Sequence, residues 1–311
     1  MVLERKGVCY NRGMIYEVED RWLHIDISSL FVKTIQEFFD EYIPSKKVQH
    51  LLIQNKQILL DGNPVKREDD IAGMKLDIMI YPETYEYEEV SLKPDVVYED
   101  ELFLVVNKPK DVLIHSDDDE ITLNKMVESY FIDKNYLSAH PLHRLDKQTS
   151  GLVVYSKSPV FQPLLDQLMA HKQIRREYLA FVQGKMEVGK NMTIDKPIGK
   201  DRHDPNKRII YRNGQNALTK VRCLACNKAK NYSVLLCTLD TGRTHQIRVH
   251  LSSIGYPILN DTLYGSESDL CIRMGLFARS VELYHPLKED RLDVEAELPN
   301  DLNKLYLAGL K

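Results

Sequence analysis

A polar segment with one carboxylate between two cations carries the clearest chemical signal in the 311-residue sequence. The segment runs from His140 to Gly151 between two apolar stretches, where a rigid sheet would present reactive groups on a loop. Within it, Asp146 has Arg144 and Lys147 as close neighbours. Positive neighbours favour the ionised carboxylate, which is the form that a nucleophile requires. The spacing alone, however, favours an ordinary turn that carries a surface salt bridge.

A second polar segment, Thr241 to His250, is predicted to begin a helix whose first turn would offer free backbone N–H groups to an anion. Arg248 follows the inward-facing Ile247 at the edge of the buried stripe. A partly buried arginine requires a carboxylate or phosphate partner. His245 and His250 do not have the i, i+4 spacing of a helical metal pair, so we interpret them as structural histidines.

Tyr178 is a third candidate, on an apolar strand directly behind the basic pair Arg175 and Arg176. Taken alone, this pattern favours a core tyrosine whose hydroxyl reaches the surface. The CxxC of Cys223 and Cys226 lies in a segment that alternates like a strand, so we interpret both thiols as packing residues rather than metal ligands. The chain has five cysteines, an odd and modest number that favours a reducing compartment.

The elements that would hold these segments in place fall into three parts. Residues 1–82 predict a helix over 33–42 and a second helix capped by Ser45, with Val48, Leu51 and Leu52 facing inward. A strand then enters a tight Asp61–Gly62 turn. Residues 83–94 are acidic and lack periodicity, which is typical of a linker.

The third part, residues 95–311, is predicted to be mostly β-structure with inserted helices. One helix would start at Ser158 and another would cover 241–255. Strands are expected over 102–107, 151–155, 177–182, 218–224, 232–239 and 276–283. The pattern predicts an α+β fold, with a mixed, mainly antiparallel β-sheet and flanking helices preceded by a small α/β domain.

The charge is distributed unevenly along the chain. A net charge of −4 argues against a simple nucleic-acid binder, yet residues 171–230 hold 15 Lys and Arg against 5 Asp and Glu. Residues 83–101 hold 8 acidic residues and one lysine. A basic surface can therefore coexist with an acidic linker, although charge alone also allows a solvated basic face without a partner. No apolar run reaches the ~20 residues of a membrane span, and residues 1–10 show no secretory signal, so we expect a cytoplasmic protein.

The order and spacing of the polar motifs resemble the RluA-type family of RNA pseudouridine synthases. The matching segments are His143–Gly151, Tyr178–Gly184, Leu239–Leu251, Gly255–Asp261 and Tyr264–Gly265, with Asn107-Lys-Pro109 before them. The resemblance covers residues 95–311 and implies a pseudouridine synthase fold for this catalytic domain. Residues 1–82 look like an S4-type RNA-binding domain, which would be joined to it by the acidic linker 83–94.

The resemblance also implies roles for individual residues. Asp146 would enable cleavage of the N1–C1′ glycosidic bond, Arg248 would pair with Asp146, and Tyr178 would stack on the target base. Arg144 would enter the RNA stack in place of the flipped uridine, because a stacked base is not accessible to the enzyme. The other substrate-binding candidates are His143, Thr149, Arg243 and His245. The isomerisation conserves atoms, so we expect no cofactor and no metal.

Several positions depart from the family's pattern. Arg176 stands where lysine is usual, Asp111 where glycine is usual, Phe277 where histidine is usual and Asn216 where lysine often stands. None of them is a catalytic candidate. They bear on the identity of the substrate rather than on the reaction.

Ribosomal RNA is the first expected substrate because of the S4-like domain, and transfer RNA is the second; a monomer is the default assembly. A non-catalytic RNA-binding protein that keeps the fold is an alternative, but it would have lost Asp146, Tyr178 or Arg248. A glycoside hydrolase also uses a carboxylate at an anomeric carbon, but usually with a second carboxylate. The motifs offer only Asp240 and Glu177 for that role.

Overall fold

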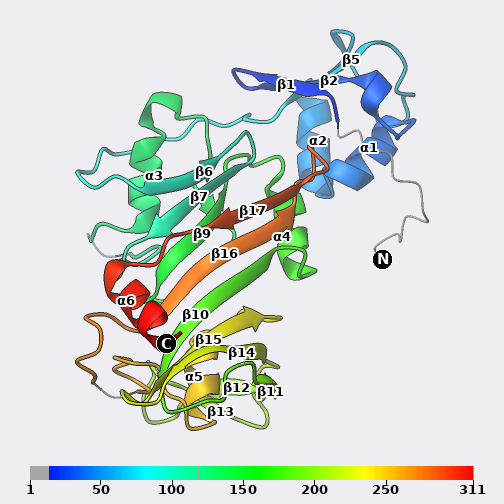
Figure 1. Ribbon diagram of the computed structural model, residues 1–311. Coiled ribbons are helices and arrows are strands. Elements are labelled where there is room, and N and C mark those ends of the chain that lie inside the picture. The colour runs from blue at the N-terminus through cyan, green and yellow to red at the C-terminus, as the bar shows by residue number, and fades with distance from the viewer. Residues whose placement is uncertain (1–13, 118–119, 266, 311) are drawn as a thin grey trace.

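The computed structural model describes residues 14–117, 120–265 and 267–310. Two sheets of different size dominate it, the smaller near the N-terminus and the larger in the rest of the chain (Figure 1). Residues 1–10, for which the sequence predicts no secretory signal, lie outside the described part. Within that part, every helix is too short or too polar to cross a bilayer.

The N-terminal unit is an antiparallel sheet with helices packed beside it (Figure 1). The strand order is β1-β2-β5-β3-β4. The strands are β1 (Tyr16–Glu19), β2 (Trp22–Asp26), β3 (Ile58–Leu60), β4 (Asn63–Pro64) and β5 (Lys75–Met79), and a 3-10 turn η1 (Ile27–Ser29) follows β2. The predicted Asp61–Gly62 turn joins β3 to β4, and both residues have the positive φ that such a turn requires.

Both predicted N-terminal helices are present, as α1 (Ile35–Tyr42) and α2 (Lys46–Gln54). The Ser45 side chain accepts a hydrogen bond from the backbone N–H of Val48, as the sequence predicts for a helix cap. The prediction that Leu51 faces inward is wrong, because its side chain is 41% exposed while Leu52 is buried. Neighbouring residues on a helix point about 100° apart, so a nine-residue helix presents only one stripe to the sheet.

The large sheet has ten strands in the order β11-β14-β15-β10-β16-β9-β7-β6, with β17 beside β16 and β8 beside β9 (Figure 1). Only the β9–β16 pairing is parallel, so the predicted mixed, mainly antiparallel sheet is confirmed. The strands are β6 (Asp95–Glu99), β7 (Phe103–Lys108), β8 (His140–Pro141), β9 (Ser150–Ser156), β10 (Arg175–Gln183), β11 (Asn191–Asp195), β14 (Leu218–Asn227), β15 (Tyr232–Leu239), β16 (Leu276–Tyr284) and β17 (Arg291–Glu295). A separate hairpin consists of β12 (Ile198–Lys200) and β13 (Arg208–Ile210).

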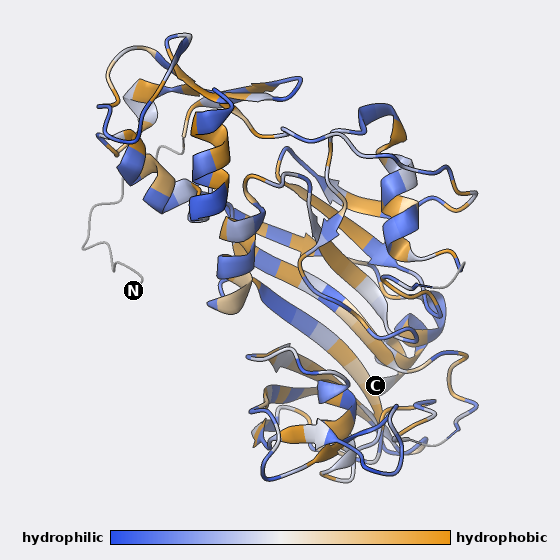
Figure 2. Ribbon diagram, turned by 180° about the vertical axis from the view of Figure 1, so that it is seen from behind, coloured by the Kyte–Doolittle hydropathy of each residue, from blue (hydrophilic) through white to orange (hydrophobic). Residues whose placement is uncertain are grey.

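Helices border this sheet, and its central strands are hydrophobic along much of their length (Figure 2). Every residue of β9 is buried, which explains the apolar run at its centre, residues 152–155. The helices are α3 (Leu123–Tyr130), η2 (Ile132–Lys134), α4 (Gln162–Ala170), α5 (Gln246–Ser252) and α6 (Asn300–Gly309).

Two helices begin later than the sequence predicts. The residues from Ser158 form a turn, and α4 begins only at Gln162. The helix predicted from Thr241 begins at Gln246, because His245 has a left-handed φ of 58° that a right-handed helix cannot contain. The expected anion-binding first turn at Thr241 is therefore wrong, and this segment is a loop.

Residues 81–94 contain no helix or strand, yet they lie along the large domain. The backbone N–H of Tyr85 donates to the carbonyl of Asn135 at 2.8 Å, and the Tyr87 hydroxyl donates to the carbonyl of Leu137 at 2.9 Å. The segment predicted as a linker therefore packs against its neighbour rather than spanning open solvent.

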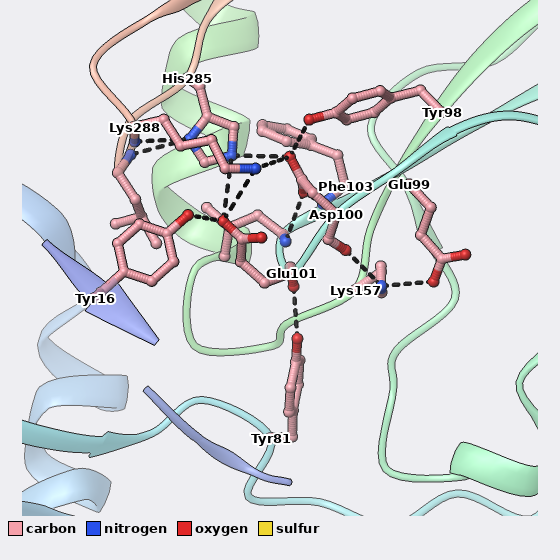
Figure 3. A network of polar contacts seen from close by, with 12 residues as sticks. Tyr16, Tyr81, Tyr98, Glu99, Asp100, Glu101, Phe103, Lys157, His285 and Lys288 are labelled. Carbon is pink, nitrogen blue, oxygen red and sulfur yellow. Dashed lines mark hydrogen bonds and ion pairs between the residues drawn. The ribbon is translucent and has the colours of Figure 1, made fainter. Parts of the chain in front are cut away.

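A buried group of charges joins the two units. We call Asp100, Glu101, His285 and Lys288 the junction cluster (Figure 3). The Tyr16 hydroxyl reaches Glu101 from the N-terminal unit. Nearby, the Tyr81 hydroxyl donates to the carbonyl of Glu101 at 2.6 Å (Figure 3).

Candidate active site

An open pocket of about 1280 Å³ lies where the loop before β9 meets the loop before α5. The tertiary structure brings all three predicted motif segments to this pocket, although they are far apart in the chain. The predicted site residues that line it are His143, Arg144, Asp146, Tyr178, Arg243, His245 and Arg248.

Asp146 and Arg248 are in direct contact at the wall of the pocket. Arg248 Nη1 donates to Asp146 Oδ2 at 3.0 Å, so the arginine has the carboxylate partner that its sequence position requires. The Asp146 side chain is 25% exposed. Among the described residues, its hydrogen bond and ion pairs all go to Oδ2, which leaves Oδ1 for a bound molecule.

A second aspartate holds the other side of Arg248. Nε and Nη2 of the guanidinium donate to the two oxygens of Asp261, each at 2.8 Å. Asp261 is fully buried and also accepts hydrogen bonds from the backbone N–H groups of Leu263 and Tyr264. Burial lowers the pKa of Arg248, but the contacts with Asp261 and Asp146 outweigh it and raise the pKa above its ordinary value. Arg248 is therefore a fixed cation, and one of its N–H groups points at Asp146.

Sequence reasoning gave Asp261 no role, although it lies in a quoted motif. The available signal was the demand of a buried arginine for counter-charge, and the structure shows that two carboxylates share it. Tyr264 was missed in the same way. Its hydroxyl lies 2.9 Å from His245 Nδ1, and its ring lies 5.2 Å from the Arg248 guanidinium carbon.

His245 completes this side of the pocket, with Nε2 3.8 Å from Asp146 Oδ2. Burial lowers the pKa of its imidazole, which favours the neutral ring at physiological pH. The left-handed backbone of His245 turns the chain into α5, which begins at the next residue and carries Arg248.

Lys108 supports the loop that carries Asp146. Its ammonium group donates to the backbone carbonyls of Pro109, Val112 and Lys147, at 2.9, 2.7 and 3.0 Å. Burial lowers its pKa to about 8. The lysine therefore ties the residue after Asp146 to the end of β7, and it does not reach into the pocket.

Gly151 fixes the far end of the same loop. It has a φ of 114°, and a Cβ built on it would lie 2.2 Å from the carbonyl oxygen of Ala278 in β16. Only glycine fits where β9 first meets its parallel neighbour, so the end of the Asp146 loop is held against the sheet.

Tyr178 lies on β10 with its ring at the pocket, and its side chain is buried. Burial raises the pKa of its hydroxyl, and the Arg176 charge opposes that effect. His143 is also buried at the pocket wall. Its Nε2 accepts a hydrogen bond from the backbone N–H of Val154 at 3.3 Å, and burial holds its pKa well below the usual value. Both groups are uncharged at neutral pH.

Thr149 lies apart from the other predicted site residues. It is buried, it does not line the pocket, and its backbone N–H donates to the Asp146 carbonyl at 3.1 Å. Thr149 therefore closes the turn beneath the carboxylate, and its contact with a substrate stays a prediction.

Neither Asp240 nor Glu177 is free to act as a second carboxylate beside Asp146. Asp240 lines the pocket but forms an ion pair with Lys220 at 3.1 Å, and Glu177 pairs with Arg175 at 2.7 Å. In the part of the chain that the structure describes, the one group of three potential metal-ligating side chains is Asp100, Glu101 and His285, which lies outside this pocket.

Comparisons with known proteins agree with this architecture. Residues 102–253 match the family model described as RNA pseudouridylate synthase. The chain is similar to the uncharacterized RNA pseudouridine synthase YhcT of Bacillus subtilis, with 35% identity over 83% of each chain. It is also similar to the ribosomal large subunit pseudouridine synthase D of Escherichia coli K12, with 31% identity over 88% of each chain.

Among solved structures, human RNA pseudouridylate synthase domain containing 1 has a TM-score of 0.57 and 27% identity, over 67% of this chain and 84% of that one. The segment that matches the family model contains Asp146, Tyr178 and Arg248. Because similarity at this level extends over most of the chain, the protein belongs to the RluA-type family of RNA pseudouridine synthases, isomerases that convert uridine in RNA to pseudouridine.

Proposed function

We propose that this protein isomerises a uridine of ribosomal RNA and that Asp146 is the carboxylate that acts at the glycosidic bond. The observation that carries the proposal is the geometry of Asp146, whose Oδ2 is held by Arg248 while the partly exposed side chain faces a large open pocket. The Escherichia coli relative is named a ribosomal large subunit pseudouridine synthase, which supports a ribosomal substrate. An RNA substrate agrees with a protein that acts in the cytoplasm. A monomer is the assembly that we propose.

The pocket residues then take the following parts. Asp146 enables the N1–C1′ bond to break, the uracil turns, C5 joins C1′, the proton leaves C5 and N1 gains one. Tyr178 provides a neutral ring on which an unstacked base can lie. Arg144, which is exposed at the rim, replaces the flipped base in the stack. Arg243 and His245 contact the substrate from the opposite loop.

We also propose that residues 1–82 are an S4-like RNA-binding domain, 83–94 a linker and 95–311 the catalytic domain. The separate N-terminal sheet supports this division. Lys46, Lys47 and Lys56 lie on or directly after α2 and are available to RNA phosphates.

The test is tritium release from C5-tritiated uridine in total RNA from a strain that lacks this gene, with EDTA present. Wild type should release tritium, and Asp146→Asn should lose ~10³-fold or more of the rate. Asp293→Asn, which removes a half-exposed carboxylate on β17, is the matched control and should behave as wild type. Sequencing of the product RNA then identifies the uridine. A variant Asp146→Asn that is as active as wild type would refute the role of this carboxylate.

A further inference from the structure

The pocket contains a charge that the proposed roles leave unused. The lining cations apart from Arg248 are Arg144, Lys147, Lys172, Arg176, Arg208 and Arg243. Lys147 pairs with Glu120 at 3.2 Å. Arg208 donates to the backbone carbonyls of Pro205 and Lys207. Arg144, Lys172 and Arg243 are exposed to water, which solvates their charge.

Arg176 differs from these because, in the described part of the chain, it is half-buried without a carboxylate partner and, unlike Arg208, keeps a buried Nε atom that donates to no acceptor. Among the described residues no carboxylate forms an ion pair with it, and its Nε atom is buried without a hydrogen-bond partner. The nearest carboxylate along the strand, Glu177, is taken by Arg175 at 2.7 Å. A guanidinium that is partly removed from water and has no anion is unfavourable, so an arginine in this position points to an anion that arrives from outside.

The strand geometry aims Arg176 at the same pocket as Tyr178. Residues two apart in a strand point to the same side, and both line the pocket while Glu177 between them does not. The pairing of β10 with β16 shifts register between Glu177 and Tyr178. The guanidinium lies close to the open loop at Gly242, where an added Cβ would be 3.7 Å from Nη2 and 3.8 Å from Nη1.

The charge of Arg176 acts on both neutral groups at the pocket wall. Burial is the main cause of the lowered pKa of His143, and Arg176 adds to it. At Tyr178 burial raises the pKa of the hydroxyl, and the Arg176 charge opposes it.

We infer that Arg176 binds a phosphodiester group next to the target uridine. Uracil and ribose are neutral, so the phosphates are the anions that an RNA substrate brings into the pocket. The planar guanidinium matches two phosphate oxygens, whereas a lysine would make a point contact. Arg176 lies only two residues along the strand from Tyr178, on whose ring the target base would lie. The phosphate is therefore the one on the 5′ or the 3′ side of the target nucleotide. This inference rests on the proposed function of the pocket.

The first experiment compares Arg176→Met, Arg176→Lys and Arg175→Met on an RNA fragment that contains the uridine mapped with wild type. Arg176→Met should weaken RNA binding and raise KM by about ten- to a hundredfold with a smaller change in kcat, because a charged contact is lost. Arg176→Lys should recover much of the binding. Arg175→Met removes a neighbouring arginine on the solvent side and should bind as wild type. Thermal unfolding shows whether each variant is folded.

The second experiment neutralises one phosphate of the RNA at a time. A methylphosphonate replaces the linkage on the 5′ or the 3′ side of the target, with a deoxynucleotide before it for stability, and the reference RNA has the same deoxynucleotide with an ordinary phosphate. At one of the two linkages, the change should weaken binding to wild type about tenfold and leave binding to Arg176→Met unchanged.

The outcomes separate this inference from the proposed function. Additive effects of Arg176→Met and the methylphosphonate at both linkages would overturn the phosphate contact, as would a loss of kcat with unchanged binding, which would mean that Arg176 only positions Tyr178. A wild-type protein that converts no uridine would overturn the proposed function itself, and the inference with it.

Discussion

The candidate active site and the junction cluster both consist of carboxylates and cations that are partly or fully buried, yet one is open and the other closed. In the active site, the hydrogen bond and ion pairs of Asp146 go to one oxygen and its side chain is 25% exposed. In the junction cluster, Asp100 is 5% exposed. Its Oδ1 accepts the N–H groups of Leu102 and Phe103, and its Oδ2 faces Tyr98, His285 and Lys288 (Figure 3).

This difference shows why charge and burial alone do not identify a catalytic group. The side chains of Asp100, Glu101 and His285 lie close enough together to suggest a metal site. However, the Lys288 ammonium group already lies 3.2 Å from Asp100 and 3.4 Å from Glu101. His285 Nδ1 accepts the backbone N–H groups of Leu287 and Lys288, so a neutral ring carries its proton on Nε2, facing Asp100. The cluster is an internal ion pair that needs no further ligand.

An aspartate-to-asparagine substitution in each cluster tests the comparison. Among Asp261→Asn, Asp100→Asn and Lys288→Met, the first should have the largest effect. The asparagine amide places an N–H group against the guanidinium of Arg248. Because two donors then face each other, the guanidinium turns away from Asp146. A small displacement of a catalytic group costs roughly 100-fold in rate, so kcat should fall by that amount with little change in RNA binding. Single-turnover tritium release and RNA affinity measure the two quantities. An unchanged kcat would show that the contact between Arg248 and Asp146 does not depend on Asp261.

Asp100→Asn should lower stability without lowering kcat. Breaking a buried ion pair on one side costs about 3 kcal/mol. Burial would raise the pKa of Asp100, but its contacts with His285, Tyr98 and the Phe103 N–H outweigh this and hold the pKa far below the ordinary value of an aspartate. The carboxylate therefore stabilises the fold above pH 4 and loses that contribution as the pH falls further.

Urea unfolding of wild type and Asp100→Asn at a series of pH values measures this effect. The difference in free energy of unfolding should be constant above pH 5 and shrink below pH 4. A difference that grows in acid would mean that the aspartate is not ionised in the folded protein.

Lys288→Met should have the smallest effect of the three. The lysine side chain is 40% exposed, so solvent screens its ion pairs and the loss should be at most about 1 kcal/mol. The effect should decrease further with added salt, and tritium release should stay at the wild-type rate. Limited proteolysis near residues 81–94 reports on the contact between the two units. A loss of activity would show that this junction is coupled to the pocket.

Local signals in the sequence predicted much of the fold. The cap at Ser45 and the alternation along β14 depend on neighbours a few residues away, so they can be recognised without a structure. The true start of α5 at Gln246 could not be recognised from the sequence. The left-handed turn at His245 that precedes it is accompanied by the contact of the His245 ring with Tyr264, 19 residues later in the chain.

The site shows the same division between local and long-range information. The sequence by itself singled out Asp146, Tyr178 and Arg248 as the predicted site, because each stands in a motif that resembles those of the RluA-type family. Only the tertiary structure decided that Asp261 shares Arg248, that Thr149 turns away from the pocket and that Arg176 has no counter-charge. These facts depend on contacts between distant segments, and the cost of an unpaired buried charge becomes visible only when all of its neighbours are in place.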